Sequence, residues 1–216
     1  MAKNILIINA SSKTKGSFSR EISLTFAEHL QKSEYKGQVL YRDLAQSYIP
    51  HVDQNWIDAD SKPVANRNAQ DIDILKISNV LIQEIRDADI VVLSTPMYNW
   101  SIPSSLKAYL DQIMRFDETF TANPNKDGSR YSGLLRGKTL FLLLSRGSLG
   151  YGKGERNEYM DFQSSYLKMV FGIMGFEKIH ELSINGTKRT TPELGQELSI
   201  LKRKLASLLD NEVHIK

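Results

Sequence analysis

The sequence contains no cysteine, which excludes disulfide bonds, a thiolate nucleophile and cysteine-ligated metal sites. A chain without disulfides is typical of the cytoplasm, and we expect that location. No apolar run approaches the roughly 18 residues of a membrane-spanning helix, so we expect no membrane association. Met1 to Lys3 lead directly into a predicted strand, which argues against a signal peptide.

The chain also lacks a large excess of positive or negative charge. The 28 lysines and arginines barely exceed the 25 acidic residues, and the net charge is +3. Nucleic-acid-binding proteins usually concentrate their basic residues, whereas here both signs are spread along the chain, so no nucleic-acid partner is expected. A length of 216 residues with 41% hydrophobic residues favours a single α/β domain spanning residues 1–216.

Five short apolar runs predict buried strands, at residues 3–8, 38–41, 90–93, 139–144 and 179–184. Helical periodicity predicts a helix after each strand: one carrying Ile22, Phe26 and Leu30, then 69–86, one beginning at Ser104, 164–174 and 191–209. Alternating strands and helices with right-handed crossovers give a doubly wound five-stranded parallel sheet. We predict the flavodoxin-like strand order 2-1-3-4-5.

Two polar stretches interrupt this pattern. Residues 47–68 show no sustained period, so we expect a long excursion with at most short helical turns. Residues 116–133 are rich in Asn, Asp, Ser and Gly, and we expect a surface loop.

The loop after the third strand carries aromatic, thioether and amide side chains between two prolines, and Ser104 is expected to cap the helix that follows. Its candidate ligand-binding residues are Pro96, Met97, Tyr98, Asn99 and Trp100. Open α/β sheets bind ligands at the carboxyl ends of their strands, and flat polarisable side chains suit a heteroaromatic ring. Alternatively, these residues pack on the next helix as an ordinary lid.

The loop after the first strand is rich in hydroxyl groups and opens a helix. It runs from Asn9 to Arg20 and contains four serines and one threonine. Free N–H groups and the positive end of a helix dipole bind phosphate, and serine hydroxyls add donors. The loop matches neither a Walker motif nor a dinucleotide fingerprint, because Gly16 is its only glycine. Solvated capping of the helix is the alternative.

The loop after the fourth strand begins Ser145-Arg146-Gly147-Ser148 and continues with further glycines. Exposed N–H groups here would suit an electron-rich carbonyl edge, whereas a flexible solvated loop is the alternative. In the predicted strand order the loops after strands one, three and four share one rim. They would hold the phosphate tail, the ring and the ring edge of one ligand, and FMN has these three parts.

These residues resemble a known family. The segments 9–11 with 17–19, 96–111, and 134–138 with 145–148 are similar to those of the FMN-dependent NADH azoreductases, which also reduce quinones. The resemblance implies tightly bound FMN, NADH as electron donor, quinones or azo compounds as substrates, and homodimers with FMN at the subunit interface. It also implies that Ser11, Ser17, Phe18 and Ser19 bind the phosphate and ribityl region of FMN. Met97 to Trp100 would then contact the isoalloxazine, and Ser145 to Ser148 would hold its pyrimidine edge. Ser148 stands where the family commonly has glycine.

Such an enzyme needs no catalytic side chain, because the cofactor carries the hydride. His29, His51, His180 and His214 all lie outside the three loops, and no metal site is predicted. The competing class is a flavodoxin-type electron carrier, although those proteins are usually smaller and acidic. A third hypothesis is a phosphodiesterase acting on acyl carrier protein, but no metal cluster or nucleophile–base pair in the sequence supports it.

Overall fold

The computed structural model describes residues 2–123, 130–189 and 192–213. The main strands are β1 (Ile5–Asn9), β2 (Val39–Asp43), β3 (Ile90–Pro96), β6 (Thr139–Ser145) and β7 (Lys178–Ile184). The α-helices are α1 (Phe18–Lys32), α2 (Gln54–Ser61), α3 (Ala69–Ile74), α4 (Lys76–Asp87), α5 (Ser104–Ile113), α6 (Phe162–Met174) and α7 (Pro192–Val213). Two short strands, β4 (Phe120–Ala122) and β5 (Tyr131–Gly133), and two 3₁₀ helices, η1 (Val64–Asn66) and η2 (Glu158–Met160), complete the described elements.

The main sheet has the order β2-β1-β3-β6-β7 with every neighbouring pair parallel. Counted along these five strands, the order is 2-1-3-4-5, so the predicted fold class is confirmed. The central strands β1, β3 and β6 are buried along nearly their whole length, which explains their continuous apolar runs.

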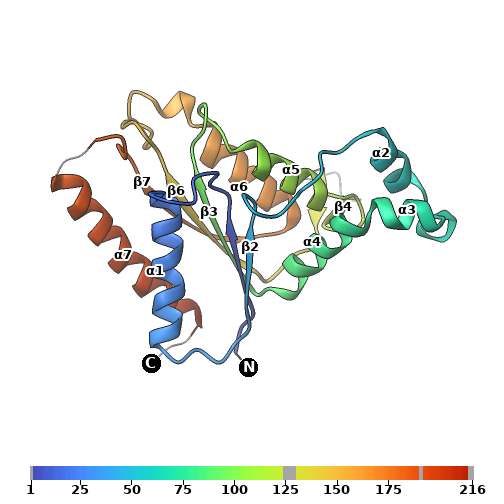
Figure 1. Cartoon of the computed structure of the whole chain (residues 1–216), viewed down its shortest axis with the longest axis horizontal. Helices are drawn as coiled ribbons and strands as arrows, with labels where there is room; N and C mark the ends of the chain where they lie inside the picture. Colours follow the sequence, from blue (N-terminus) through green and yellow to red (C-terminus); the bar gives the residue numbers. More distant parts are fainter. Residues whose placement is uncertain (1, 124–129, 190–191, 214–216) are drawn as a thin grey trace.

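Helices cover both faces of the sheet (Figure 1). Ile5 and Ile7 of β1 pack with α1 and α7 on one face, whereas Leu6 and Ile8 pack with α4, α5 and α6 on the other. Successive strand side chains point to opposite faces, so each central strand contributes to two hydrophobic layers.

The 47–68 segment contains more helix than predicted. Asp53 caps α2 by accepting a hydrogen bond from the Trp56 N–H, and the Trp56 indole N–H donates to Gln112 of α5 at 2.9 Å. These two side chains are 56 residues apart in the sequence, so local periodicity does not reveal the contact that holds α2 in place. The α2 and α3 helices lie beyond α4 at the right of Figure 1.

The single helix predicted over 69–86 is wrong, because the structure has two helices that meet at Leu75. Asn68 and Asp71 form a capping box that starts α3. The Leu75 side chain is buried in a small cluster with Trp56 and Ala59. The point where α3 ends and α4 begins is therefore packed against α2.

The loop predicted over 116–133 instead contains the antiparallel pair β4 and β5. The Phe120 ring meets Phe116 and Tyr131 edge-on, at centroid distances of 5.9 and 5.5 Å. Residues 124–129 of this predicted loop, like His214, lie outside the described residues. The expected Ser104 cap is also wrong, because the N-cap of α5 is Pro103 and no side chain caps that helix.

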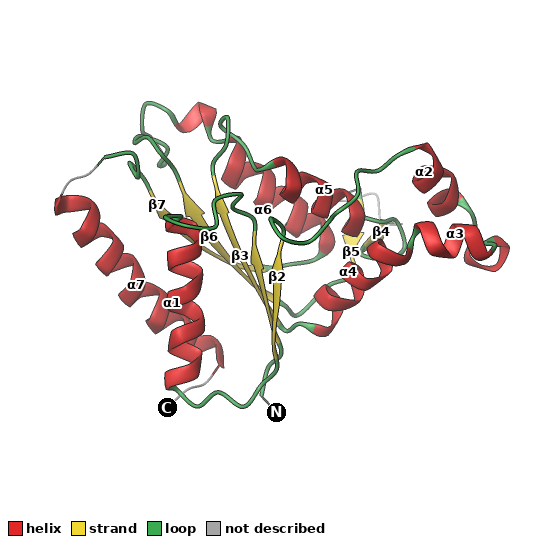
Figure 2. Ribbon diagram, viewed as in Figure 1, coloured by secondary structure: helices red, strands yellow, loops and turns green. Residues whose placement is uncertain are grey.

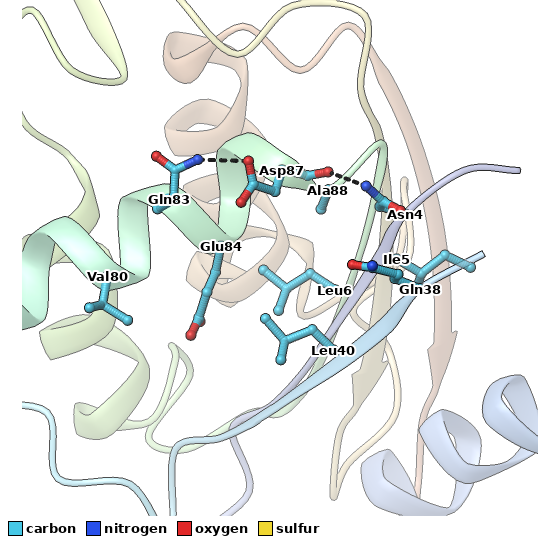
Figure 3. A pocket seen from close by; sticks show the side chains of 10 residues that line it. All are labelled: Asn4, Ile5, Leu6, Gln38, Leu40, Val80, Gln83, Glu84, Asp87 and Ala88. Carbon is cyan, nitrogen blue, oxygen red and sulfur yellow. Dashed lines mark hydrogen bonds between the residues drawn. The ribbon is translucent and has the colours of Figure 1, made fainter. Parts of the chain in front are cut away.

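A groove of about 320 Å³ lies between α4 and the edge of the sheet (Figure 3). Its walls include Leu6, Leu40 and Val80, and at its end the Asp87 carbonyl accepts a hydrogen bond from the Asn4 side chain. This groove opens near the amino ends of β1 and β2. Ligands of open α/β sheets bind at the opposite rim, where the carboxyl ends of the strands lie.

Candidate functional site

A pocket of about 550 Å³ lies at the carboxyl ends of β1, β3, β6 and β7. Its walls come from four segments: Ser11, Lys13 and residues 16–18; residues 96–100; Ser145, Gly147, Ser148 and Tyr151; and Thr187 with Lys188. The loops that supply them lie on the upper side of the sheet in Figure 2. The three loops singled out from the sequence therefore form one site.

The hydroxyls of Ser11, Ser17 and Ser19 form a cluster at the start of α1. The Ser17 hydroxyl is 2.9 Å from that of Ser11 and 3.1 Å from that of Ser19. Ser17 is also the N-cap of α1. Within the described chain, the N–H groups of Phe18 and Ser19 donate to no protein acceptor. This end of the pocket is therefore built to receive an anion.

Arg20 supports the same loop from behind. Its guanidinium donates hydrogen bonds to the backbone carbonyls of Ser11 at 2.7 Å and Lys13 at 2.8 Å. It also forms a bidentate salt bridge with the Asp43 carboxylate, at 2.6 and 2.8 Å. The hydrogen bond from Arg20 holds the pKa of the Asp43 carboxyl below its usual value. Because the carbonyls face Arg20, they do not face the anion site.

The aromatic loop after β3 makes a tight turn from Tyr98 to Ser101, closed by two backbone hydrogen bonds of 3.0 Å. Asn99 and Trp100 have positive φ angles of 48° and 65°. Asparagine tolerates this conformation, but a bulky tryptophan rarely adopts it, so the turn is strained at the pocket wall. The Met97 N–H donates to the Ser145 carbonyl at 2.8 Å, which joins this loop to the next strand.

The glycine loop after β6 is joined to the loop after β7 by backbone hydrogen bonds. The N–H groups of Gly186, Thr187 and Lys188 donate to the carbonyls of Ser148, Arg146 and Gly147, respectively. In the described chain the N–H groups of Gly147 and Ser148 have no protein acceptor. Ser148 does not have a positive φ angle, so this backbone position does not require glycine.

The Arg146 side chain points away from the pocket. It is buried, and it binds Asp161 at 2.8 Å and Gln163 at 3.2 Å, with Glu181 at 3.6 Å. Its guanidinium lies 5.7 Å from the centre of the Tyr151 ring. Asp161 is the N-cap of α6, so Arg146 connects the glycine loop to that helix.

The charges at the pocket are positive. Lys13 and Lys188 line it, and among the described residues no aspartate or glutamate does. The described residues also contain no group of three or more His, Cys, Asp or Glu side chains able to hold a metal ion. None of the helices described is long and apolar enough to cross a membrane.

The candidate residues taken from the sequence all line the pocket except Ser19 and Arg146, whose side chains are buried beneath it. Sequence reasoning missed Lys13, Gly16 and Tyr151, although they lie in the loops it selected. It also missed Thr187 and Lys188. The predicted strand order could have found these two, because it places the loop after the fifth strand next to the loop after the fourth.

A family model described as "Flavodoxin-like fold" matches residues 3–207. The chain is 35% identical over 182 residues to FMN-dependent NADH:quinone oxidoreductase 2 of Pseudomonas fluorescens, covering 84% of this chain and 87% of that protein. It is 33% identical over 204 residues to the protein of the same name from Pseudomonas putida, covering 94% and 98%.

Among solved structures, an FMN-dependent NADH-azoreductase from Bacillus anthracis in complex with FMN has a TM-score of 0.86 to this chain. The two are 22% identical, and the match covers 98% of this chain and 99% of the other. At this identity the likeness shows the shared fold.

Proposed function

The chain belongs to the flavodoxin-like family that includes the FMN-dependent NADH:quinone oxidoreductases, and from this premise we propose that it is an FMN-dependent enzyme that oxidises NADH and reduces quinones and aromatic azo compounds. The observation that carries the proposal is the convergence of unpaired N–H groups and aromatic side chains around one pocket of about 550 Å³. That volume lies within the range typical of pockets for cofactors and drug-sized ligands.

The residues present fit FMN part by part. The N–H groups of Phe18 and Ser19, with the nearby hydroxyls, suit the phosphate. The 96–100 loop offers a flat wall for the ring. The N–H groups of Gly147 and Ser148 suit the carbonyl edge of the pyrimidine.

FMN, when bound, supplies the chemistry by taking hydride from NADH and passing it to the second substrate. The residues of the chain bind FMN and orient it. The serine cluster and Lys13 anchor the phosphate, the strained turn at Asn99 and Trp100 positions the ring, and Gly147 with Ser148 fixes its edge. Full cleavage of an azo bond to two amines requires two hydride deliveries, whereas a quinone requires one.

We also infer that residues 1–216 form one FMN-binding domain and that the protein resides in the cytoplasm. The family match over 3–207 supports the first part, and the lack of cysteine supports the second.

A homodimer is part of the same proposal. One side of α6 carries a helical stripe formed by Phe162, Tyr166, Met169 and Ile173. Phe162 and Met169 are 59% and 50% exposed, whereas Tyr166 and Ile173 are half-buried. The stripe begins next to Asp161, which binds Arg146 of the glycine loop. A second copy seated on this stripe would therefore lie close to the glycine loop, which itself lines the pocket, and this supports FMN sites shared by two subunits.

The test begins with the absorbance spectrum of the purified protein. We expect the spectrum of bound flavin and its bleaching by NADH without oxygen. With a quinone or azo dye, initial rates at several NADH concentrations should give parallel double-reciprocal lines, because donor and acceptor react in turn at one site. Intersecting lines, with a flavin that only one-electron partners reoxidise, would instead support an electron carrier. Protein that binds no FMN would exclude both.

A further inference from the structure

Lys188 lies directly against the glycine loop. A Cβ atom built on Gly147 would stand 3.0 Å from the Lys188 Cε, 3.1 Å from its Cγ and 3.2 Å from its Cδ. The aliphatic stem of Lys188 therefore runs across the face of Gly147, and the side chain forms part of the pocket wall. The backbone holds this arrangement, since the Lys188 N–H donates to the Gly147 carbonyl at 3.2 Å.

The Lys188 ammonium is the uncompensated charge at this end of the pocket. Arg146, one residue before Gly147, is neutralised by Asp161 and Glu181. Lys188 forms no ion pair with any carboxylate in the described part of the chain. Its positive charge is thus available to a ligand that meets the free N–H groups of Gly147 and Ser148.

We propose that Lys188 stabilises negative charge on the pyrimidine edge of FMN and so raises the reduction potential of the bound cofactor. This inference rests on the proposed function. Two-electron reduction by hydride places negative charge on the N1–C2–O2 edge until a further proton arrives. A fixed cation beside that edge favours the reduced form over the oxidised form, as charge near a flavin generally tunes its electronics.

The test compares Lys188→Gln with Arg189→Gln. Both substitutions remove one positive charge from the same loop, but Arg189 does not line the pocket and its guanidinium lies over Gly186. The measurements are the two-electron reduction potential of the bound FMN and its dissociation constant for sulfite, made on each variant after it has been loaded with FMN and freed of unbound FMN. Sulfite adds to flavin N5 and leaves negative charge on the same edge, so it reports the local field without turnover.

For Lys188→Gln we expect the equilibrium constant for reduction of the bound cofactor to fall about tenfold. This lowers the reduction potential by about 30 mV for a two-electron couple. Sulfite binding should weaken by a similar factor. Lys188→Arg should keep most of both values, and Arg189→Gln should change each less than about twofold, since its charge is farther away and screened by water.

Equal values for Lys188→Gln and Arg189→Gln, with a wild type that binds FMN normally, would overturn this inference and leave the proposed function standing. A wild type that does not bind FMN would overturn both. If Lys188→Arg lowered the reduction potential and the sulfite affinity as much as Lys188→Gln does, the inference would also be overturned. The effect would then depend on the aliphatic part of the lysine side chain and not on its charge.

Discussion

Ser17 caps α1 and also lines the pocket, so one hydroxyl serves both the helix and the proposed phosphate site. Ser19, two residues later, is fully buried and does not line the pocket. Ser17 is therefore the position where an added charge tests the anion site with the least disturbance of the core.

Ser17→Asp should fold normally, because aspartate is as good an N-cap as serine. Its carboxylate would face the phosphate, and a like-charge contact at a partly buried site costs a few kcal/mol, about a hundredfold in FMN affinity. Riboflavin, which lacks the phosphate, should bind nearly as it does to the wild type. Fluorescence titration of the apo-protein with both flavins measures this.

Ser12→Asp is the matched control, since Ser12 lies in the same loop, is exposed and does not line the pocket. It should weaken FMN binding only slightly. Equal weakening of FMN and riboflavin by Ser17→Asp would place the phosphate elsewhere.

The pair of strands β4 and β5 is attached to the C-terminal end of α6 through two glycines. A Cβ on Gly133 would stand 2.2 Å from the backbone N of Gly175, closer than any real contact. Gly175 itself is the C-cap of α6 with a φ angle of 106°. Leu135 completes the attachment by donating its N–H to the Met174 carbonyl at 2.8 Å.

Gly133→Ala should lower the free energy of unfolding by about 1–3 kcal/mol, the usual cost of overpacking, because backbone and not a flexible side chain must move. Gly195→Ala, in α7, should have the opposite effect, since a Cβ there meets nothing within 4 Å. It should stabilise by about 0.5–1 kcal/mol, because alanine loses less conformational freedom in a helix. Urea unfolding followed by circular dichroism compares the two; the same sign for both would contradict the packing argument.

Glu212, in the C-terminal part of α7, connects this helix to strands β6 and β7. This buried carboxylate accepts hydrogen bonds from Lys178 at 2.5 Å, His180 at 2.8 Å and Thr139 at 3.2 Å. Burial alone would raise the pKa of Glu212, but the hydrogen bonds from Lys178 and His180 outweigh it and hold the pKa below its usual value. The ionised form is thus the one that stabilises the fold.

A lowered folded-state pKa contributes stability above the unfolded-state pKa, and that contribution is lost as the pH falls through the folded value. Glu212→Gln should therefore destabilise at neutral pH, by about 1–3 kcal/mol, and the difference from wild type should shrink as the pH falls below the usual pKa of a glutamate. Urea unfolding at fixed protein concentration measures both. The exposed Glu177→Gln should match wild type throughout, and a Glu212→Gln deficit that does not vary with pH would rule out the charged carboxylate as its cause.

For the molecule as a whole, the sequence predicts the main sheet well and the attached segments poorly. Buried parallel strands such as 139–144 are short, continuous apolar runs, and short connections with right-handed crossovers favour their observed order. The α2 helix depends on Trp56 reaching Gln112, a contact that no local pattern records. In the site, loop membership was predictable, but side-chain direction was not: Arg146 turns inward to Asp161, whereas Lys188 reaches in from another loop.

The proposed dimer gives a whole-molecule prediction. Met169→Glu places a charge in the centre of the α6 stripe and should shift the protein from dimer to monomer in light scattering, with loss of quinone reductase activity. Ile200→Glu is the matched control, because Ile200 is similarly exposed, at 57% against 50%, but lies on α7, on the other face of the sheet. A Met169→Glu protein that remains dimeric would exclude the α6 stripe as the interface.

The support that Arg20 gives to the serine loop has a kinetic consequence. Since the carbonyls of Ser11 and Lys13 are already engaged, the loop has little ordering left to do when an anion arrives. Capture of FMN by the apo-protein should then be a single exponential process whose rate rises linearly with FMN concentration and falls with added salt, as steering by the exposed Lys13 and Lys15 is screened. Substitutions that loosen this support, such as Arg20→Lys, should shorten the residence time of FMN more than they slow its arrival.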